Sequence, residues 1–306
     1  MRSLFKRLCL IPIVLVSPAL AGPVFAQSDA VQVQSQVQTQ PQIQPEVESQ
    51  VQAAVEAEIV EGPRVQGEVF EYSTGGETYQ GYLARNIADD QPRPAVLVVH
   101  EWWGLDDYAR ARADQLAALG FVALAVDMYG GGKTTEHPDE AGAFSKRVMQ
   151  DWPAARARLE AAMVKLSQHP AVAGERMAAI GYCFGGGVVM NMALAGMPIE
   201  AAISFHGSPT RAVTQPQPFE GIVEIHNGAA DTLVKHDALL AMTSALEAHG
   251  ASVEIINYPG AEHGFSNPHA DEVAAKYGLP VGYDPAADAA SWQAALLTLD
   301  EALNDE

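Results

Sequence analysis

The chain has 306 residues, 48% of them apolar, and its 38 acidic side chains outnumber the 18 basic ones to give a net charge of −20. This length is enough for one large α/β domain or two small ones. The negative charge makes nucleic acids and anionic membrane surfaces poor candidates for partners, because both are themselves negatively charged. Two cysteines are too few for a disulfide scaffold.

The first 26 residues are typical of a signal peptide. Three basic residues among the first seven precede an apolar run over residues 8–16, which is too short to cross a bilayer. Small residues then lead to Ala26, after which we expect cleavage, while Ala21 is a second possible site and an uncleaved anchor is the alternative. We therefore expect a secreted or periplasmic protein without stable membrane insertion, whose only remaining cysteine is Cys183.

Residues 27–64 have a low-complexity composition. Glutamine occupies every even position from 32 to 44, interleaved mainly with valine, serine, threonine and proline. Alternating valine and glutamine is compatible with a strand, but Pro41, Pro45 and the lack of large apolar side chains favour a disordered tether. An adhesive β-segment is the alternative interpretation.

From residue 65 onward, short apolar runs alternate with amphipathic segments. We expect a hairpin from residues 67–72 and 79–84, strands at 95–99, 121–126, 177–180, 201–205, 222–225 and 253–257, and helices at 106–119, 140–150, 153–167, 186–195, 237–249 and 286–303. Strands that alternate with helices predict an α/β fold with a mostly parallel central sheet and helices on both faces. The pattern indicates one domain over residues 65–306.

Cys183 stands in a glycine-rich turn between an apolar strand and an apolar helix. Gly181 comes two residues before it and Gly185 two residues after it, a spacing typical of a nucleophile elbow, whose strained turn leaves no room for flanking side chains. A thiol there lies at a helix N-terminus, where the helix dipole favours the thiolate. The alternatives are a turn that merely packs and a dinucleotide site, which would need glycine at position 183.

Candidates for a general base and its orienting acid follow Cys183 in the chain order that such a site requires. Asp231 comes after the predicted strand 222–225, and His263 comes after the predicted strand 253–257. Both therefore lie at carboxyl ends of strands, the edge where α/β sheets build their sites. For Asp231 the alternative is a solvated loop carboxylate.

Three further histidines also follow predicted strands. With Glu101 they form a conceivable metal cluster, although no pair has the helical spacing of metal ligands. These residues are His100, His206 and His226. We do not expect a metal or a cofactor.

From about residue 65 to the C-terminus, the chain resembles the dienelactone hydrolase family of α/β-hydrolases. The resemblance rests on the cysteine-centred elbow, on Asp231 and His263, and on two segments, His100-Glu101-Trp102-Trp103-Gly104-Leu105 and Asp127-Met128-Tyr129-Gly130. It implies a hydrolase that cleaves ester or lactone bonds through a thioester intermediate. Cys183 would be the nucleophile, His263 the base and Asp231 the residue that orients it.

The resemblance also implies roles for residues around this triad. Glu101 would hold or deprotonate the resting thiol, with a salt-bridged carboxylate at a helix start as the alternative. The backbone N–H groups of Trp102 and Phe184 would form the oxyanion hole. The residues expected to line the substrate pocket are Trp103, Tyr129, Phe205, His206 and Phe265.

Three positions depart from the pattern of family members that act on dienelactone. Those members carry two arginines and a serine that grip the substrate carboxylate, where this chain has Gly131, Gly264 and Asn267. We therefore expect small, uncharged esters or lactones as substrates. Residues 268–285 look like an insertion that covers the site.

Two other classes of function remain open at this point. One is a binding module that keeps the hydrolase fold without turnover, and the other is a thiol redox protein that uses Cys183. The sequence leaves the oligomeric state open and favours a monomer.

Overall fold

The computed structural model describes residues 62–304 of the chain. The predicted signal peptide and residues 27–61 of the predicted tether lie outside this range and stay predictions. Within the range, no helix combines the length and the apolar character needed to cross a bilayer.

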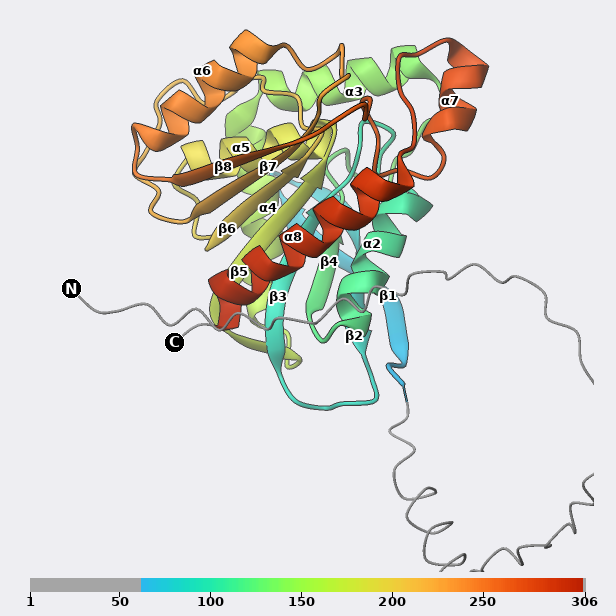
Figure 1. The fold of residues 1–306 in the computed structure, drawn as a ribbon. Coiled ribbons are helices and arrows are strands. Elements are labelled where there is room, and N and C mark those ends of the chain that lie inside the picture. Colours follow the sequence, from blue (N-terminus) through green and yellow to red (C-terminus); the bar gives the residue numbers. More distant parts are fainter. Residues whose placement is uncertain (1–61, 305–306) are drawn as a thin grey trace, which may run out of the picture. The chain divides into compact units, whose positions relative to one another are not determined.

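One eight-stranded sheet forms the centre of the described part, in the order β1-β2-β4-β3-β5-β6-β7-β8 (Figure 1). The first two strands form an antiparallel hairpin, β2 runs antiparallel to β4, and the remaining neighbours pair in parallel. The strands are β1 (Val65–Thr74), β2 (Glu77–Asn86), β3 (Arg93–Val99), β4 (Val122–Val126), β5 (Val172–Tyr182), β6 (Ala201–Phe205), β7 (Ile222–Gly228) and β8 (Ser252–Tyr258). The parallel part of the sheet places the carboxyl ends of β3 to β8 at one edge.

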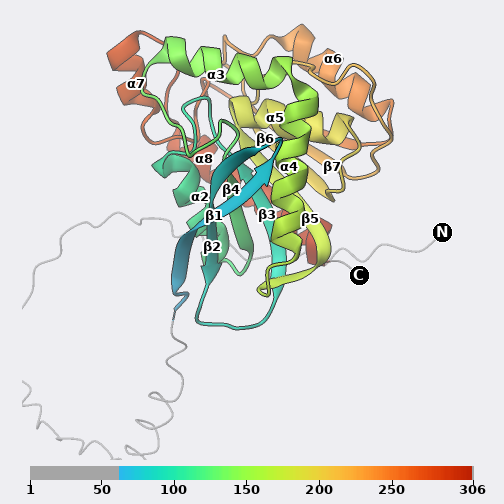
Figure 2. The same ribbon diagram turned by 180° about the vertical axis from the view of Figure 1, so that it is seen from behind.

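Helices cover both faces of this sheet. In Figure 1, α2 (Asp107–Ala118) and α8 (Pro285–Asn304) lie in front of it, and in Figure 2 α4 (Trp152–Ser167) lies in front of the opposite face. α5 (Phe184–Leu194) and α6 (His236–Glu247) pack into the same apolar cluster as α4. The fold is thus the predicted α/β arrangement with a mostly parallel sheet between two helical layers.

The central strands separate two apolar cores because their side chains alternate between the faces. In β3, Leu97 and Val99 belong to the core beneath α4 and α5, whereas Val96 and Val98 belong to the core beneath α2 and α8. All four side chains are fully buried, and each such burial contributes roughly 1.5–3 kcal/mol. A continuous run of apolar residues in the sequence therefore indicates a strand that is covered on both faces of the sheet.

Two short helices lie at the edge where the strands end. α3 (Pro138–Gln150) was expected from the sequence, whereas α7 (Ala270–Tyr277) was not. In α7 only Ala270 is buried, so the helix lacks the apolar stripe that identifies helices in a sequence. The left-handed residue Gly278, at φ 67°, ends it and is the one local signal that its sequence carries.

Candidate active site

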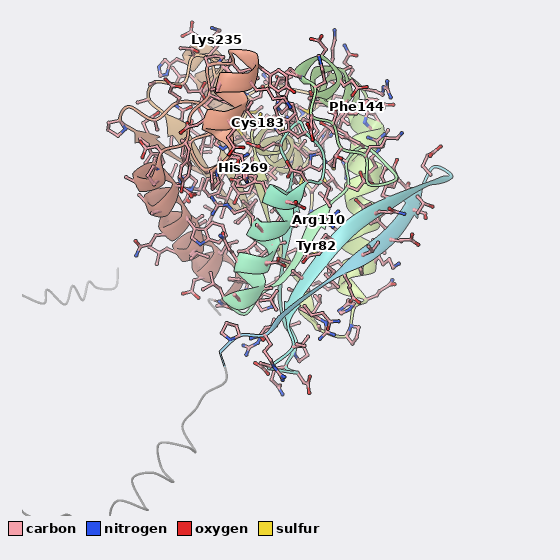
Figure 3. The ribbon with its side chains drawn as sticks, turned by 90° about the vertical axis from the view of Figure 1, so that its right-hand side faces the viewer. Tyr82, Arg110, Phe144, Cys183, Lys235 and His269 are labelled. Carbon is pink, nitrogen blue, oxygen red and sulfur yellow. The ribbon has the colours of Figure 1, made fainter. Side chains whose placement is uncertain are left out.

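The glycine-rich turn predicted to be a nucleophile elbow forms where β5 passes into α5. Cys183 lies between them with φ 51° and ψ −112°, a backbone conformation that residues other than glycine rarely adopt. A β-carbon on Gly181 would lie 2.1 Å from the Gly185 carbonyl oxygen, and one on Gly185 would lie 2.1 Å from that of Val99. Only glycine fits at either position, which is the physical reason for the spacing that predicted the turn. Figure 3 shows Cys183 in the interior of the domain, towards the end where α6 and α7 lie.

The structure brings Cys183, His263 and Asp231 into one hydrogen-bonded line. His263 Nε2 lies 3.1 Å from Cys183 Sγ, and His263 Nδ1 lies 2.8 Å from Asp231 Oδ2. The second carboxylate oxygen of Asp231 accepts hydrogen bonds from the backbone N–H groups of Leu233 at 2.7 Å and Val234 at 3.0 Å. Since the Asp231 side chain is fully buried, these bonds fix its orientation. It is therefore not a solvated loop carboxylate.

Electrostatics within this line favour a charged imidazole. Burial alone would lower the pKa of His263, but the neighbouring Cys183 sulfur and the Asp231 carboxylate together raise it well above its usual range. Burial would raise the pKa of Asp231, yet the hydrogen bond and charge of His263 lower it. The arrangement is suited to a thiolate–imidazolium pair, the reactive form of a cysteine nucleophile.

The backbone N–H groups of Trp102 and Phe184 lie on the segments that follow β3 and β5. Within residues 62–304 neither group donates a hydrogen bond to another protein atom. Tyr129 braces both segments, because its hydroxyl donates to the Trp102 carbonyl oxygen at 2.9 Å and its ring packs 5.7 Å from that of Phe184. These two donors are thus held in place and available to a substrate oxygen.

Glu101 has a different partner from the one expected. Its carboxylate accepts a hydrogen bond from Asn267 Nδ2 at 2.7 Å, while the Cys183 sulfur faces His263. Burial raises the pKa of Glu101 to about 7, and the nearby charge of Asp106 adds to this shift. In this geometry Glu101 forms no hydrogen bond with the Cys183 thiol. Its partner is Asn267, a position that we noted in the sequence only because it differs from the family members that act on dienelactone.

A cavity of about 660 Å³ opens above Cys183. Among the five residues predicted to line it, only Trp103 does so. Phe205, His206 and Phe265 are instead fully buried in the core. The Tyr129 hydroxyl bonds to the Trp102 carbonyl oxygen and does not line the cavity. The prediction was wrong for these four. The ring of Phe205 stacks on that of Tyr182 in the core, and the rings of His206 and Phe265 pack against each other.

His206 contacts the backbone of Cys183. The backbone N–H of Cys183 is shared between the Phe205 carbonyl oxygen at 3.0 Å and His206 Nδ1 at 3.1 Å. Since a backbone amide can only donate, Nδ1 is unprotonated and Nε2 carries the hydrogen, which it donates to Ser266 Oγ at 2.8 Å. Burial lowers the pKa of His206 well below its usual value, so the ring is neutral.

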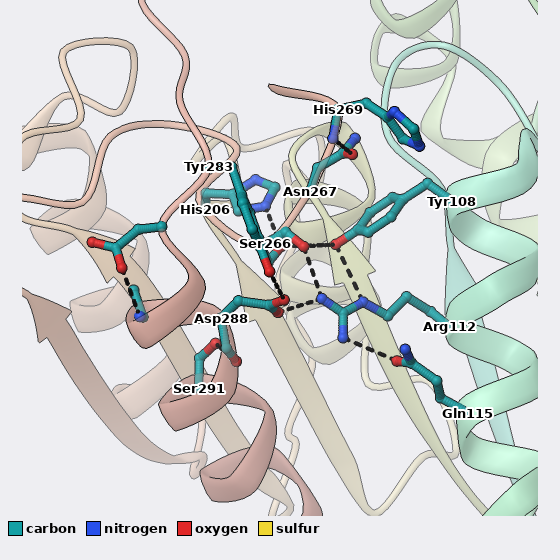
Figure 4. Close-up of polar contacts among 12 residues, drawn as sticks. Tyr108, Arg112, Gln115, His206, Ser266, Asn267, His269, Tyr283, Asp288 and Ser291 are labelled. Carbon is teal, nitrogen blue, oxygen red and sulfur yellow. Dashed lines mark hydrogen bonds and ion pairs between the residues drawn. The ribbon is translucent and has the colours of Figure 1, made fainter. Parts of the chain in front are cut away.

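A polar network continues from Ser266 to two helices (Figure 4). Ser266 Oγ lies 2.8 Å from the Tyr108 hydroxyl, and the Arg112 guanidinium donates to the Ser266 carbonyl oxygen at 2.8 Å and pairs with Asp288. The network ties α2 and α8 to the loop that carries the candidate base. Sequence reasoning missed it, and its one signal is a polar pair, Tyr108 and Arg112, on the buried face of a helix.

The other histidines considered as metal ligands have separate partners. His100 Nε2 accepts a hydrogen bond from the Met128 backbone N–H at 3.3 Å, and His226 Nε2 lies 2.7 Å from Glu224 Oε1. Across residues 62–304, no three or more His, Cys, Asp or Glu side chains are grouped as a metal site would require. The conceivable cluster of these histidines with Glu101 is thus not assembled among the described residues.

Residues 268–285 form a roof over the cavity, as the sequence suggested. Ala270 and Val273 of α7, together with Leu279 and Val281, line it. The roof is tied to the site, since the Gly282 backbone N–H donates to the His263 carbonyl oxygen at 3.0 Å. Of the three departures noted in the sequence, Gly264 and Asn267 line the cavity and Gly131 does not.

Known proteins match this chain over most of its length. A sequence model described as the dienelactone hydrolase family matches residues 79–303. An Aquifex aeolicus protein named "Putative carboxymethylenebutenolidase" is 27% identical over 240 residues, which are 75% of this chain and 96% of that protein. A Bradyrhizobium protein named "Probable 2-oxo-3-(5-oxofuran-2-ylidene)propanoate lactonase" is 28% identical over 245 residues, covering 75% and 92% of the two chains.

A solved structure is also similar. It is that of a dienelactone hydrolase-like promiscuous phosphotriesterase, P91, from metagenomic libraries. It is 31% identical in sequence, has a TM-score of 0.68, and the match covers 78% of this chain and 99% of that one.

Proposed function

Because the chain belongs to the dienelactone hydrolase family and is a hydrolase of ester or lactone bonds, we propose that Cys183, His263 and Asp231 form its catalytic triad. The observation that carries this proposal is the unbroken line from Sγ through the imidazole to a buried carboxylate, at the floor of the cavity. The substrate is a small-molecule ester or lactone whose carbonyl reaches this floor.

The first half of the reaction makes a thioester. The Cys183 thiolate attacks the carbonyl carbon, and the carbonyl electron pair moves to the oxygen, which accepts hydrogen bonds from the Trp102 and Phe184 N–H groups. Each such donor lowers the barrier by about 3–4 kcal/mol. The tetrahedral intermediate then expels the alkoxide, which takes a proton from His263 Nε2 and leaves as the alcohol.

The second half regenerates the enzyme. His263, now neutral, takes a proton from water at Nε2 while the water oxygen attacks the thioester carbon. The same two N–H groups stabilise the second oxyanion, whose collapse breaks the carbon–sulfur bond. The acid product leaves and the thiolate–imidazolium pair is restored, with Asp231 orienting the ring throughout.

The test is a stopped-flow assay with 4-nitrophenyl acetate and intact mass measurement of acid-quenched samples. We expect a burst of nitrophenolate and one acetyl adduct on the wild type, no adduct in Cys183→Ala, and an adduct that persists in His263→Ala. His236→Ala, which removes an exposed histidine, is the matched control. Absence of both burst and turnover in the wild type would overturn the proposal and favour a binding module or a redox thiol.

A second candidate activity is cleavage of phosphotriesters. It is favoured by the similarity to P91, a structure described as a promiscuous phosphotriesterase. The same thiolate would attack phosphorus and displace the best leaving group. Release of nitrophenolate from paraoxon by the wild type, with no release by Cys183→Ala, is the expected result.

We also propose that the chain is exported and cleaved after Ala26. The support is the basic start, the short apolar run and the small residues before that position. N-terminal sequencing of the protein recovered from its native cells should start at Gln27. A start at Met1 on a membrane-bound protein would instead identify an uncleaved anchor.

A further inference from the structure

The cavity carries a charge opposite to that of the whole chain. Its lining includes two cationic side chains, Lys146 and Arg211, and one carboxyl group, that of the buried Glu101. Both cations are exposed, so they lie at the mouth, while Cys183 and His263 lie at the floor. Within residues 62–304 neither cation forms an ion pair with an acidic side chain.

Arg211 belongs to a loop that is held against the helix of the nucleophile. The fully buried side chain of Asn191, on α5, donates to the Thr210 carbonyl oxygen at 2.8 Å. It also accepts from the backbone N–H groups of Ala212 at 2.8 Å and Val213 at 3.1 Å. These bonds hold the backbone on both sides of Arg211, so the fold fixes the point from which this exposed side chain extends.

One cavity of about 660 Å³ joins Cys183 at its floor to Arg211 at its mouth. The cavity wall between them is largely apolar and includes Phe184 and Val234.

Lys146 reaches the mouth from a second helix in the same layer as α5. It lies on α3, as does Met149, and both line the cavity. The helix is placed by Phe144, whose ring packs 5.3 Å from that of Tyr129, the residue that braces Trp102. The mouth is thus formed by two separately anchored cations with apolar surface below them.

We infer that Lys146 and Arg211 form a subsite for the anionic end of an ester substrate whose apolar acyl chain spans the cavity to Cys183. This inference rests on the proposed function. It replaces the expectation of small, uncharged substrates, which considered only positions 131, 264 and 267. A carboxylate at the mouth meets two cations that, among residues 62–304, form no ion pair with an acidic side chain, in a chain whose net charge is −20.

The test compares two esters of equal length, 4-nitrophenyl octanoate and the 4-nitrophenyl monoester of suberic acid. The measured quantity is the ratio of kcat/KM for the anionic ester to that for the neutral one. We expect the double variant Lys146→Glu with Arg211→Glu to lower this ratio by about tenfold, the size expected for reversing two exposed charges. Added salt should lower the wild-type ratio as well.

The matched control is Arg147→Glu with Lys235→Glu, which changes the net charge equally on exposed side chains that do not line the cavity. It should leave the ratio unchanged. If both esters form an acyl-enzyme but the double variant does not alter the ratio of kcat/KM values, the inference is overturned and the proposed function stands. Failure to form an acyl-enzyme with either ester would overturn the proposed function and the inference with it.

Discussion

Glu101→Gln should change the pH dependence of stability by a predictable amount. The substitution removes a buried titratable group and keeps an oxygen that accepts the hydrogen bond from Asn267. Burial raises the pKa of Glu101 from 4.5 to about 7, so between these values the folded state keeps a proton that the unfolded state has lost. The free energy of unfolding of the wild type therefore falls as the pH rises from about 4.5 to about 7. Above pH 7 the contribution of Glu101 stays constant.

The size of the effect follows from the shift. At about 1.4 kcal/mol per pKa unit, the variant should gain about 2–3 kcal/mol relative to wild type between pH 5 and pH 8. Urea unfolding followed by tryptophan fluorescence at both pH values measures this difference. Glu247→Gln, on an exposed side chain, is the control and should show little change. An equal Glu101→Gln effect at pH 5 and pH 8 would refute the reasoning.

Three further substitutions test the site and its supports. Asp231→Asn should reduce kcat/KM for a chromogenic ester about 10²- to 10⁴-fold, since the imidazole loses its orienting charge. Gly185→Ala puts a β-carbon against the Val99 carbonyl oxygen and should cost about 3 kcal/mol or more in urea unfolding. Arg112→Met leaves the largely buried Asp288 carboxylate without its ion-pair partner and should destabilise the fold by about 3–5 kcal/mol in the same assay.

The parts of the fold that the sequence predicted are those in which local chemistry leaves few choices. A fully buried parallel strand is a run of apolar residues, so β3, β4 and β6 could be identified directly. The elbow could be identified because backbone atoms crowd Gly181 and Gly185. The order of Cys183, Asp231 and His263 then followed from the topology of the sheet.

The parts that were missed depend on contacts between distant segments. A position at or beyond the end of a strand does not determine whether its side chain faces the cavity or the core, so Phe205 and Phe265 were assigned to the pocket but lie in the core. The bond from Asn267 to Glu101 joins residues 166 positions apart. Arg211 reaches the mouth because Asn191 holds its loop. None of these contacts leaves a periodic pattern in the sequence.

The strained backbone of the site is concentrated at one junction. Within the described residues, the non-glycine residues with positive φ are Cys183 at 51° and His206 at 40°, at the ends of neighbouring strands. Such conformations cost on the order of 1–3 kcal/mol each and persist only where their surroundings hold them. Here the Cys183 N–H donates to His206, whose other nitrogen binds Ser266, three residues beyond His263. One hydrogen-bonded chain therefore positions Cys183, the proposed nucleophile, together with the loop that carries His263, the proposed base. Loosening Ser266 should displace both.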